Sequence, residues 1–241
     1  MKCVMEKSVL QLLLPEQKEH RAAGANDLAQ TTPDEPDFLN KVITRGESWV
    51  YGYEYDLETK TQSSQWRSPG SPRPKKVQQS RSKIKTMLTA FFDWEGVVHH
   101  EYVPPGQTIN KEYHLNGLQL LRDAIGGKWS QLWATGDWQL HRDNASAPAS
   151  CLTEFFAKHH IIQVTQLPYS PDLAPCDFWL SPKLKSALKG KKSLHTVDEV
   201  RENTMGQLMV IPTKDFAECF EQWKRCWENC GRSQGAYFEG D

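Results

Sequence analysis

Two aspartates occupy positions from which carboxylates commonly bind cations. Asp143 follows a short run, Trp138–His141, that predicts a strand, and Asp177 stands where a proline-rich turn, Tyr169–Pro175, leads into a predicted helix. In α/β proteins such ends of elements face the crevice where hard cations and substrates bind. The residues alone leave two interpretations open. They are paired metal-binding carboxylates, or they are a turn residue beside Asn144 and an ordinary acid in the first turn of a helix.

A second candidate region is basic. The segment Thr61–Lys85 contains seven lysines and arginines and no acidic residue, and three prolines keep its middle extended. It is either a solvated linker or an extended arm that lies along phosphate groups, with an aromatic ring available for stacking on a base. The candidate nucleic-acid-binding residues are Trp66, Arg67, Arg73, Lys75, Lys76, Arg81, Lys83 and Lys85.

The elements that must position these residues follow from hydrophobic periodicity and turn signals. Strands are predicted at Val42–Tyr53, Ile84–Phe92 and Val97–Val103, the last two joined by a hairpin turn at Asp93–Gly96. Helices and short strands then alternate: a helix capped by Asn110, the strand Trp138–His141, a helix over Pro148–His160 and a strand over Ile161–Thr165. This order indicates an α/β fold with a mixed sheet.

The chain ends in predicted helices. Thr196 and Glu199 fit a capping box, and a last helix from Pro212 carries a stripe of large aromatic residues that we expect in the core. The stripe consists of Phe216, Phe220, Trp223 and Trp227, and Cys219, Cys226 and Cys230 flank it as small hydrophobic residues.

Composition excludes several classes of protein. The 241 residues are 38% hydrophobic and 24% charged, which is too apolar for a disordered chain, and no apolar run near the start approaches the roughly 18 residues of a membrane span. The net charge of −1 indicates no partner by itself. The six cysteines contain no C-x-x-C pair, so we expect reduced thiols and no structural zinc.

At this point a resemblance to a family becomes specific. Asp143-Asn144-Ala145, followed by the segment Pro168–Phe178, resembles the core of mariner-type transposases, and the similarity covers nearly the whole chain. It implies an RNase H-like fold, a mixed sheet flanked by helices, over residues 37–241. Residues 1–36 would be a leader, the remnant of a linker to a DNA-binding region, and residues from about 53 to 85 would form the basic arm.

The resemblance also implies a metal site. Members of the family cut and join DNA with two divalent ions, Mg²⁺ or Mn²⁺, held by three aspartates, a requirement of two-metal phosphoryl transfer. Asp143 would be the second acid and Asp177 the third, whereas the first position is Gly46. Glu47 is a possible substitute only if the strand bulges, because neighbouring strand residues project to opposite faces.

The resulting expectations are a DNA strand cleavage and transfer domain that acts in transposition in the nucleus. Its partners would be DNA and a second copy held through the 53–85 arm, with no membrane and no small-molecule substrate. Because of Gly46, we expect impaired catalysis and at most weak binding of Mg²⁺ or Mn²⁺, and Gly46→Asp should recover some nicking. The alternatives are a non-catalytic domesticated DNA-binding remnant or a decaying transposon copy without a selected function.

Overall fold

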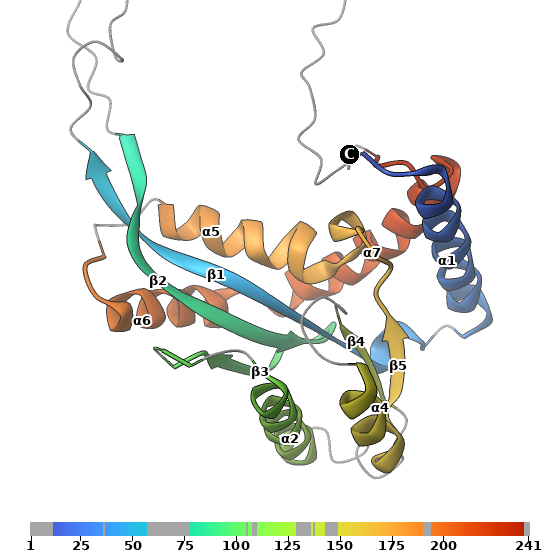
Figure 1. Ribbon diagram of the computed structural model, residues 1–241, viewed down its shortest axis with the longest axis horizontal. Coiled ribbons are helices and arrows are strands. Elements are labelled where there is room, and N and C mark those ends of the chain that lie inside the picture. Colours follow the sequence, from blue (N-terminus) through green and yellow to red (C-terminus); the bar gives the residue numbers. More distant parts are fainter. Residues whose placement is uncertain are drawn as a thin grey trace, which may run out of the picture.

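The fold is organised around one mixed sheet (Figure 1). The computed structural model describes residues 12–35, 37–56, 78–104, 106–107, 110–128, 136, 138–142, 149–189 and 194–238. The strand order is β3-β2-β1-β4-β5. The strands are β1 (Val42–Asp56), β2 (Gln78–Phe92), β3 (Val97–Tyr102), β4 (Gln139–Arg142) and β5 (Ile162–Thr165). β1, β2 and β3 pair antiparallel, whereas β4 runs parallel to β1 and β5 parallel to β4.

Helices cover both faces of this sheet (Figure 1). One face packs against α5 (Ser181–Lys189), α6 (Val197–Val210) and α7 (Thr213–Arg232), and the other against α2 (Lys111–Lys128) and α4 (Ala149–Lys158). The remaining helical elements are α1 (Pro15–Asp34), η1 (Leu39–Lys41), η2 (Pro171–Leu173) and the π-helical turn η3 (Cys176–Leu180). Within the described part of the chain, no helix combines the length and apolar character needed to cross a bilayer.

Alternation along β1 divides the core into two hydrophobic clusters. Val42 and Val50 belong to the larger cluster with α5, α6 and α7, while Ile43 belongs to the smaller one with α2 and α4. Gly46 faces the first cluster, and Glu47 faces α2. The two sides of β1 therefore have separate neighbours, as the period of two in a strand requires.

Several elements match their predictions closely. Phe216, Phe220, Trp223 and Trp227 are all buried along α7, and the side chain of Thr196 accepts a hydrogen bond from the Glu199 backbone at the start of α6. The hairpin turn is closed by Asp93, whose carboxylate accepts hydrogen bonds from the backbone N–H groups of Glu95 and Gly96. The α/β prediction with a mixed sheet is thus confirmed.

The basic arm differs from its prediction in part. β2 begins at Gln78 rather than Ile84, because its polar first residues pair with the far end of β1 as a two-stranded ribbon. Backbone hydrogen bonds hold such a ribbon whatever its side chains, which an apolar pattern does not reveal. Lys83 and Lys85 are at least partly exposed, as expected, whereas Ser82 is buried near Gly52.

The other arm residues are less completely described. Arg81 lies in β2 opposite Tyr53. Trp66, Arg67, Arg73, Lys75 and Lys76 lie outside the described residues.

Helix α1 lies in the stretch interpreted as a leader, and it packs along α7 (Figure 1). Its Arg21 is fully buried and binds Asp172 through two hydrogen bonds of 3.0 and 2.7 Å. The same guanidinium donates to the Ser170 hydroxyl and to the carbonyls of Tyr169 and Gly235. One side chain thus joins the first helix, the turn before Asp177 and the end of the chain.

Replacing Arg21 should therefore destabilise the whole domain. Arg21→Met removes the cation and leaves the carboxylate of Asp172 without this partner, which typically costs about 3–5 kcal/mol for a buried pair. Urea denaturation followed by circular dichroism would measure the loss of stability. Arg232→Gln, which removes an exposed arginine on α7, is the matched control and should cost no more than about 1 kcal/mol. Equal stability of the two variants would contradict the role given to Arg21.

Candidate functional site

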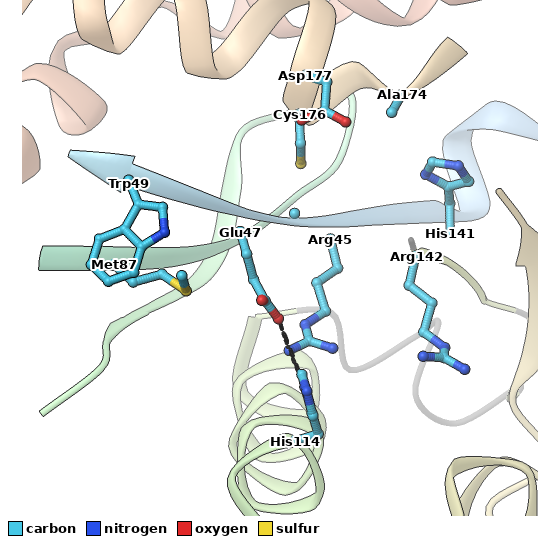
Figure 2. A pocket seen from close by; sticks show the side chains of 11 residues that line it. Arg45, Glu47, Trp49, Met87, His114, His141, Arg142, Ala174, Cys176 and Asp177 are labelled. Atoms are coloured by element: carbon cyan, nitrogen blue, oxygen red, sulfur yellow. Dashed lines mark hydrogen bonds and ion pairs between the residues drawn. The ribbon is translucent and has the colours of Figure 1, made fainter. Parts of the chain in front are cut away.

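The candidate site is a cavity of about 250 Å³ where β1 continues past the end of β4. Among the described residues, the pairing of these strands runs to Arg45 and Arg142, and the cavity lining continues along β1 at Gly46, Glu47 and Trp49. Figure 2 shows the lining side chains on both sides of β1, with Cys176 and Asp177 on one side and Arg45, Glu47 and His114 on the other. The cavity thus lies at the carboxyl end of β4, beside the parallel strand β1, and such strand ends form the usual binding crevice of α/β sheets.

Asp177 is brought to this cavity by a well-anchored turn. The indole of Trp223 donates a 2.7 Å hydrogen bond to the carbonyl of Leu173, and the backbone N–H of Asp177 donates to the carbonyl of Ala174 at 2.8 Å. The predicted connection between a proline-rich turn and an aspartate at the start of a helix is therefore present, with η3 as its first helical turn. Asp143 lies outside the described residues, and its predicted proximity to Asp177 stays a prediction.

A buried chain of hydrogen bonds links the strands to the same turn. Thr44 Oγ1 lies 2.9 Å from His141 Nδ1, and His141 Nε2 lies 2.7 Å from Gln166 Oε1. Because Gln166 donates its amide N–H to the Ser170 carbonyl, its oxygen accepts from His141, which assigns the imidazole proton to Nε2. Burial lowers the pKa of His141 to about 4. The imidazole is therefore neutral at physiological pH and serves to hold β4 against the turn.

Gly46, at the position of the expected first acid, packs against the residue before Asp177. A Cβ atom added to Gly46 would lie 2.2 Å from the Cβ of Cys176 and 2.5 Å from its sulfur. Real Cβ atoms do not approach that closely, so the side chain of Cys176 occupies the space that an acid at position 46 would need. The sequence shows that the acid is missing; the structure shows that its place is filled.

The thiol of Cys176 does not replace the missing carboxylate. Burial, together with the nearby negative charge of Asp177, raises the pKa of Cys176 well above its usual value, and a hydrogen bond with Thr44 only partly opposes this shift. The group is therefore a neutral thiol. A neutral thiol is a poor ligand for hard cations such as Mg²⁺, which prefer oxygen.

Glu47 also fails to supply the carboxylate. Its Oε1 lies 2.8 Å from Arg45 Nη2 and 3.7 Å from His114 Nδ1, on the side of β1 that faces α2 (Figure 2). The register of β1 with β2 is continuous at this point, and the irregularity in their pairing lies farther along, between Tyr51 and Tyr53. No bulge turns Glu47 toward Asp177.

The described residues of the cavity offer few ligands for a pair of divalent ions. Among them there is no group of three histidine, cysteine, aspartate or glutamate side chains that could hold a metal. Asp177 is the one carboxylate that they place on the Cys176 side of the cavity, and two buried arginines stand in the lining. The described residues therefore do not fit a two-metal centre.

Some residues of this site were not identified from the sequence. Neither Arg45 nor Arg142 was singled out from the sequence, and nothing in the sequence indicated the contact of Cys176 with β1. No local pattern in the sequence indicated the roles of His141, Gln166 and Arg21, because their hydrogen-bond partners lie far away in the chain. The arginines alone carried a usable clue, because a charged residue in a predicted core strand needs a reason.

The fold matches that of solved transposase structures. A pre-cleavage Mos1 transpososome aligns with a TM-score of 0.85 and 23% identity, covering 99% of this chain and 68% of that chain. The catalytic domain of Mos1 mariner transposase aligns with a TM-score of 0.77 and 22% identity, covering 96% of this chain and 100% of that chain. The chain is thus an RNase H-like domain, as predicted.

Sequence comparison finds similarity to transposases as well. A family model described as transposase (partial DDE domain) matches residues 56–135. Human histone-lysine N-methyltransferase SETMAR is 27% identical over 252 residues, 98% of this chain and 34% of that protein. Mariner Mos1 transposase of Drosophila mauritiana is 22% identical over 228 residues, 94% of this chain and 64% of that protein. These matches confirm the resemblance: in sequence and fold, the chain is similar to the catalytic domain of mariner-type transposases. It spans about a third of the first relative's length and just under two thirds of the second's.

The packing between Gly46 and Cys176 can be tested directly. Gly46→Ala should destabilise the protein by about 1–3 kcal/mol, because the added methyl group overpacks the contact. Cys176→Gly should suppress that destabilisation in the double variant, so a double-mutant cycle of unfolding free energies should give a clear coupling between the two positions.

Gly206→Ala is the control for this cycle. Gly206 lies within α6, and a Cβ there would meet nothing within 4 Å. Replacement by alanine should stabilise the helix by up to about 1 kcal/mol. If Gly46→Ala behaves like Gly206→Ala, the contact with Cys176 is not tight.

Proposed function

We propose that this chain binds DNA as a mariner-type transposase catalytic domain and that its strand cleavage and transfer activity is severely impaired. Its structural neighbours support the DNA part of the proposal. They include a Mos1 paired-end complex with a left transposon end and a Mos1 strand transfer complex. The identity of 23% supports a shared fold, and the activity of this chain is inferred from its own residues.

One observation carries the proposed impairment. The side chain of Cys176 fills the space beside Gly46, and the neighbouring Glu47 is paired with Arg45 on the other side of β1. A two-metal centre needs several carboxylates to fix both ions and offset their charge. Gly46 leaves the centre one acid short, and the packed side chain of Cys176 occupies the space that an acid there would need.

The proposal for metal binding follows from the acids that remain. Neighbouring structures include Mos1 paired-end complexes with Mn and with Mg, which supports divalent metal use in the family. We propose that Asp143 and Asp177 in this chain bind at most one Mg²⁺ or Mn²⁺ ion, and weakly, since magnesium tolerates one or two protein carboxylates and keeps its remaining waters.

DNA binding without cleavage is the second candidate function. The ribbon formed by β1 and β2 favours it, because Lys83 and Lys85 reach solvent there and the Lys85 ammonium lies 4.3 Å from the ring centre of Trp49. Trp49 is itself 40% exposed and lines the cavity. A cationic ribbon with a nearby aromatic ring suits a nucleic acid backbone. We further propose a homodimer through the 53–85 arm and a nuclear location.

Plasmid nicking tests the impaired chemistry. With Mg²⁺ or Mn²⁺, the unaltered chain should nick supercoiled plasmid several orders of magnitude more slowly than a relative with all three acids. The structure changes the expectation for Gly46→Asp. This variant should be less stable and should recover little nicking activity, because the new aspartate side chain would collide with Cys176. Gly46→Asp combined with Cys176→Gly should restore measurable nicking.

Two results would contradict this account. The first is rapid, metal-dependent nicking by the unaltered chain that disappears in Asp177→Ala or Asp143→Ala, which would mean that the site is complete. The second is equal restoration by Gly46→Asp alone and by the double variant, which would mean that Cys176 is no obstacle.

DNA binding has a separate test. A mobility-shift titration of duplex DNA at several salt concentrations gives the number of neutralised phosphates from its slope, about 0.9 for each phosphate. Lys83→Gln with Lys85→Gln should lower that slope by roughly 0.9 for each phosphate that is no longer bound, and Lys75→Gln with Lys76→Gln tests the arm interpretation in the same way. Lys214→Gln, at an exposed lysine on α7, is the control. If the salt slope is unchanged in both double variants, the ribbon is not part of the DNA interface.

A further inference from the structure

Two arginines stand side by side at the candidate site. Arg45 of β1 and Arg142 of β4 are register partners, and both line the cavity. They are only 6% and 4% exposed. Figure 2 shows both side chains extending to the side of β1 that faces α2, away from Cys176 and Asp177. Burying one arginine is costly, and burying two as neighbours adds mutual repulsion, so this arrangement requires compensating negative charge.

At Arg45 the compensation comes from Glu47. Arg45 Nη2 donates to Glu47 Oε1 at 2.8 Å and to His114 Nδ1 at 2.7 Å. A guanidinium only donates, so His114 Nδ1 is an acceptor and the imidazole proton lies on Nε2. The Nε of Arg45 is buried, and no described residue accepts a hydrogen bond from it. Arg45 therefore keeps one N–H donor that the described residues do not use.

The walls around the arginines are aromatic and hold the guanidiniums in place. Arg45 lies 5.5 Å from the ring centre of Phe91, and Arg142 lies 5.5 Å from that of Phe156. Such stacking orients a planar guanidinium without using its N–H groups. Forked arginine donors that are held in this way match the oxygens of a phosphate group.

The cavity has the position and size for such a ligand. It lies at the carboxyl end of β4, beside the parallel strand β1, and its volume of about 250 Å³ is several times the roughly 30 Å³ share of one water molecule. One tetrahedral phosphate group with a few waters fits this space. The cavity also reaches Trp49, the aromatic residue next to the basic ribbon.

We propose that Arg45 and Arg142 form a phosphate-binding site that works without a metal ion. The phosphate is either that of a nucleic acid backbone or free inorganic phosphate, and the experiment separates the two. Where the source is DNA, the inference rests on the proposed function. Positive charge at this edge of the sheet then comes from arginine side chains rather than from divalent cations.

Isothermal titration calorimetry with sodium phosphate tests the site. The buffer contains EDTA, and sodium chloride keeps the ionic strength constant. The unaltered chain should bind one phosphate saturably. Arg142→Gln should weaken binding about tenfold or more, because it removes a charge-assisted hydrogen bond. Arg142→Lys keeps the charge but not the fork and should weaken it less. Arg232→Gln removes an exposed arginine and should have no effect.

Circular dichroism and thermal melts without phosphate show whether each variant is folded. If Arg142→Gln does not fold, the comparison of Arg142→Lys with Arg232→Gln decides. Absence of saturable binding to the unaltered chain in EDTA would overturn the proposal, and so would equal affinity in the folded Arg142 variants and Arg232→Gln.

Duplex DNA separates the two phosphate sources. If the backbone of DNA is the source, phosphate should compete with duplex in a mobility shift, and Arg142→Gln should weaken the DNA complex. If free phosphate is the source, calorimetry shows binding while the DNA titration is unchanged by Arg142→Gln. DNA binding without any phosphate binding would overturn this inference and leave the proposed function standing. Phosphate binding without any DNA binding would overturn the proposed function and leave this inference standing.

Discussion

The structure depends on how the turn before Asp177 is held. That turn carries no regular backbone pairing with the sheet, so its place is fixed by buried polar contacts: from β4 through His141 and Gln166, from α7 through Trp223, and from α1 through Arg21. Each donor and acceptor in this set is largely out of contact with water, where an unmade hydrogen bond costs about 1–3 kcal/mol. The turn therefore has few other conformations that satisfy these groups. As a result, Asp177 is held at the cavity beside β1.

The same rigidity explains why charge is unevenly divided across the site. With the turn fixed, Cys176 lies against β1 at Gly46, and a strand residue with no side chain suits that close approach. The residues on either side, Arg45 and Glu47, necessarily face the other way and neutralise one another there. The alternation of β1 thus divides the site into a side with Asp177 and a thiol, and a side with arginines, glutamate and imidazole (Figure 2).

Much of the fold was predictable because it follows from local patterns. The aromatic stripe of α7, the capping box at Thr196 and the hairpin turn at Asp93 all follow from residues a few positions apart. The start of β2 was predicted late, because Gln78 and its neighbours are held by backbone pairing rather than by apolar side chains. Within the site, Gly46 was recognisable as a departure, but its contact with Cys176 joins residues far apart in the chain and left no trace in spacing. Arg21 in a polar helix resembled any solvated arginine.

The contacts of Arg21 also constrain the order in which the molecule can be completed during synthesis. The partners of this residue, which lies near the start, are Ser170, Asp172 and Gly235, up to 214 positions later in the chain. Until α7 and Gly235 have emerged from the ribosome, Arg21 lacks one of its acceptors, and the side of α1 that packs along α7 stays uncovered. A chain truncated shortly before Gly235 would thus lack only a few residues, yet its first helix would remain accessible to chaperones and proteases.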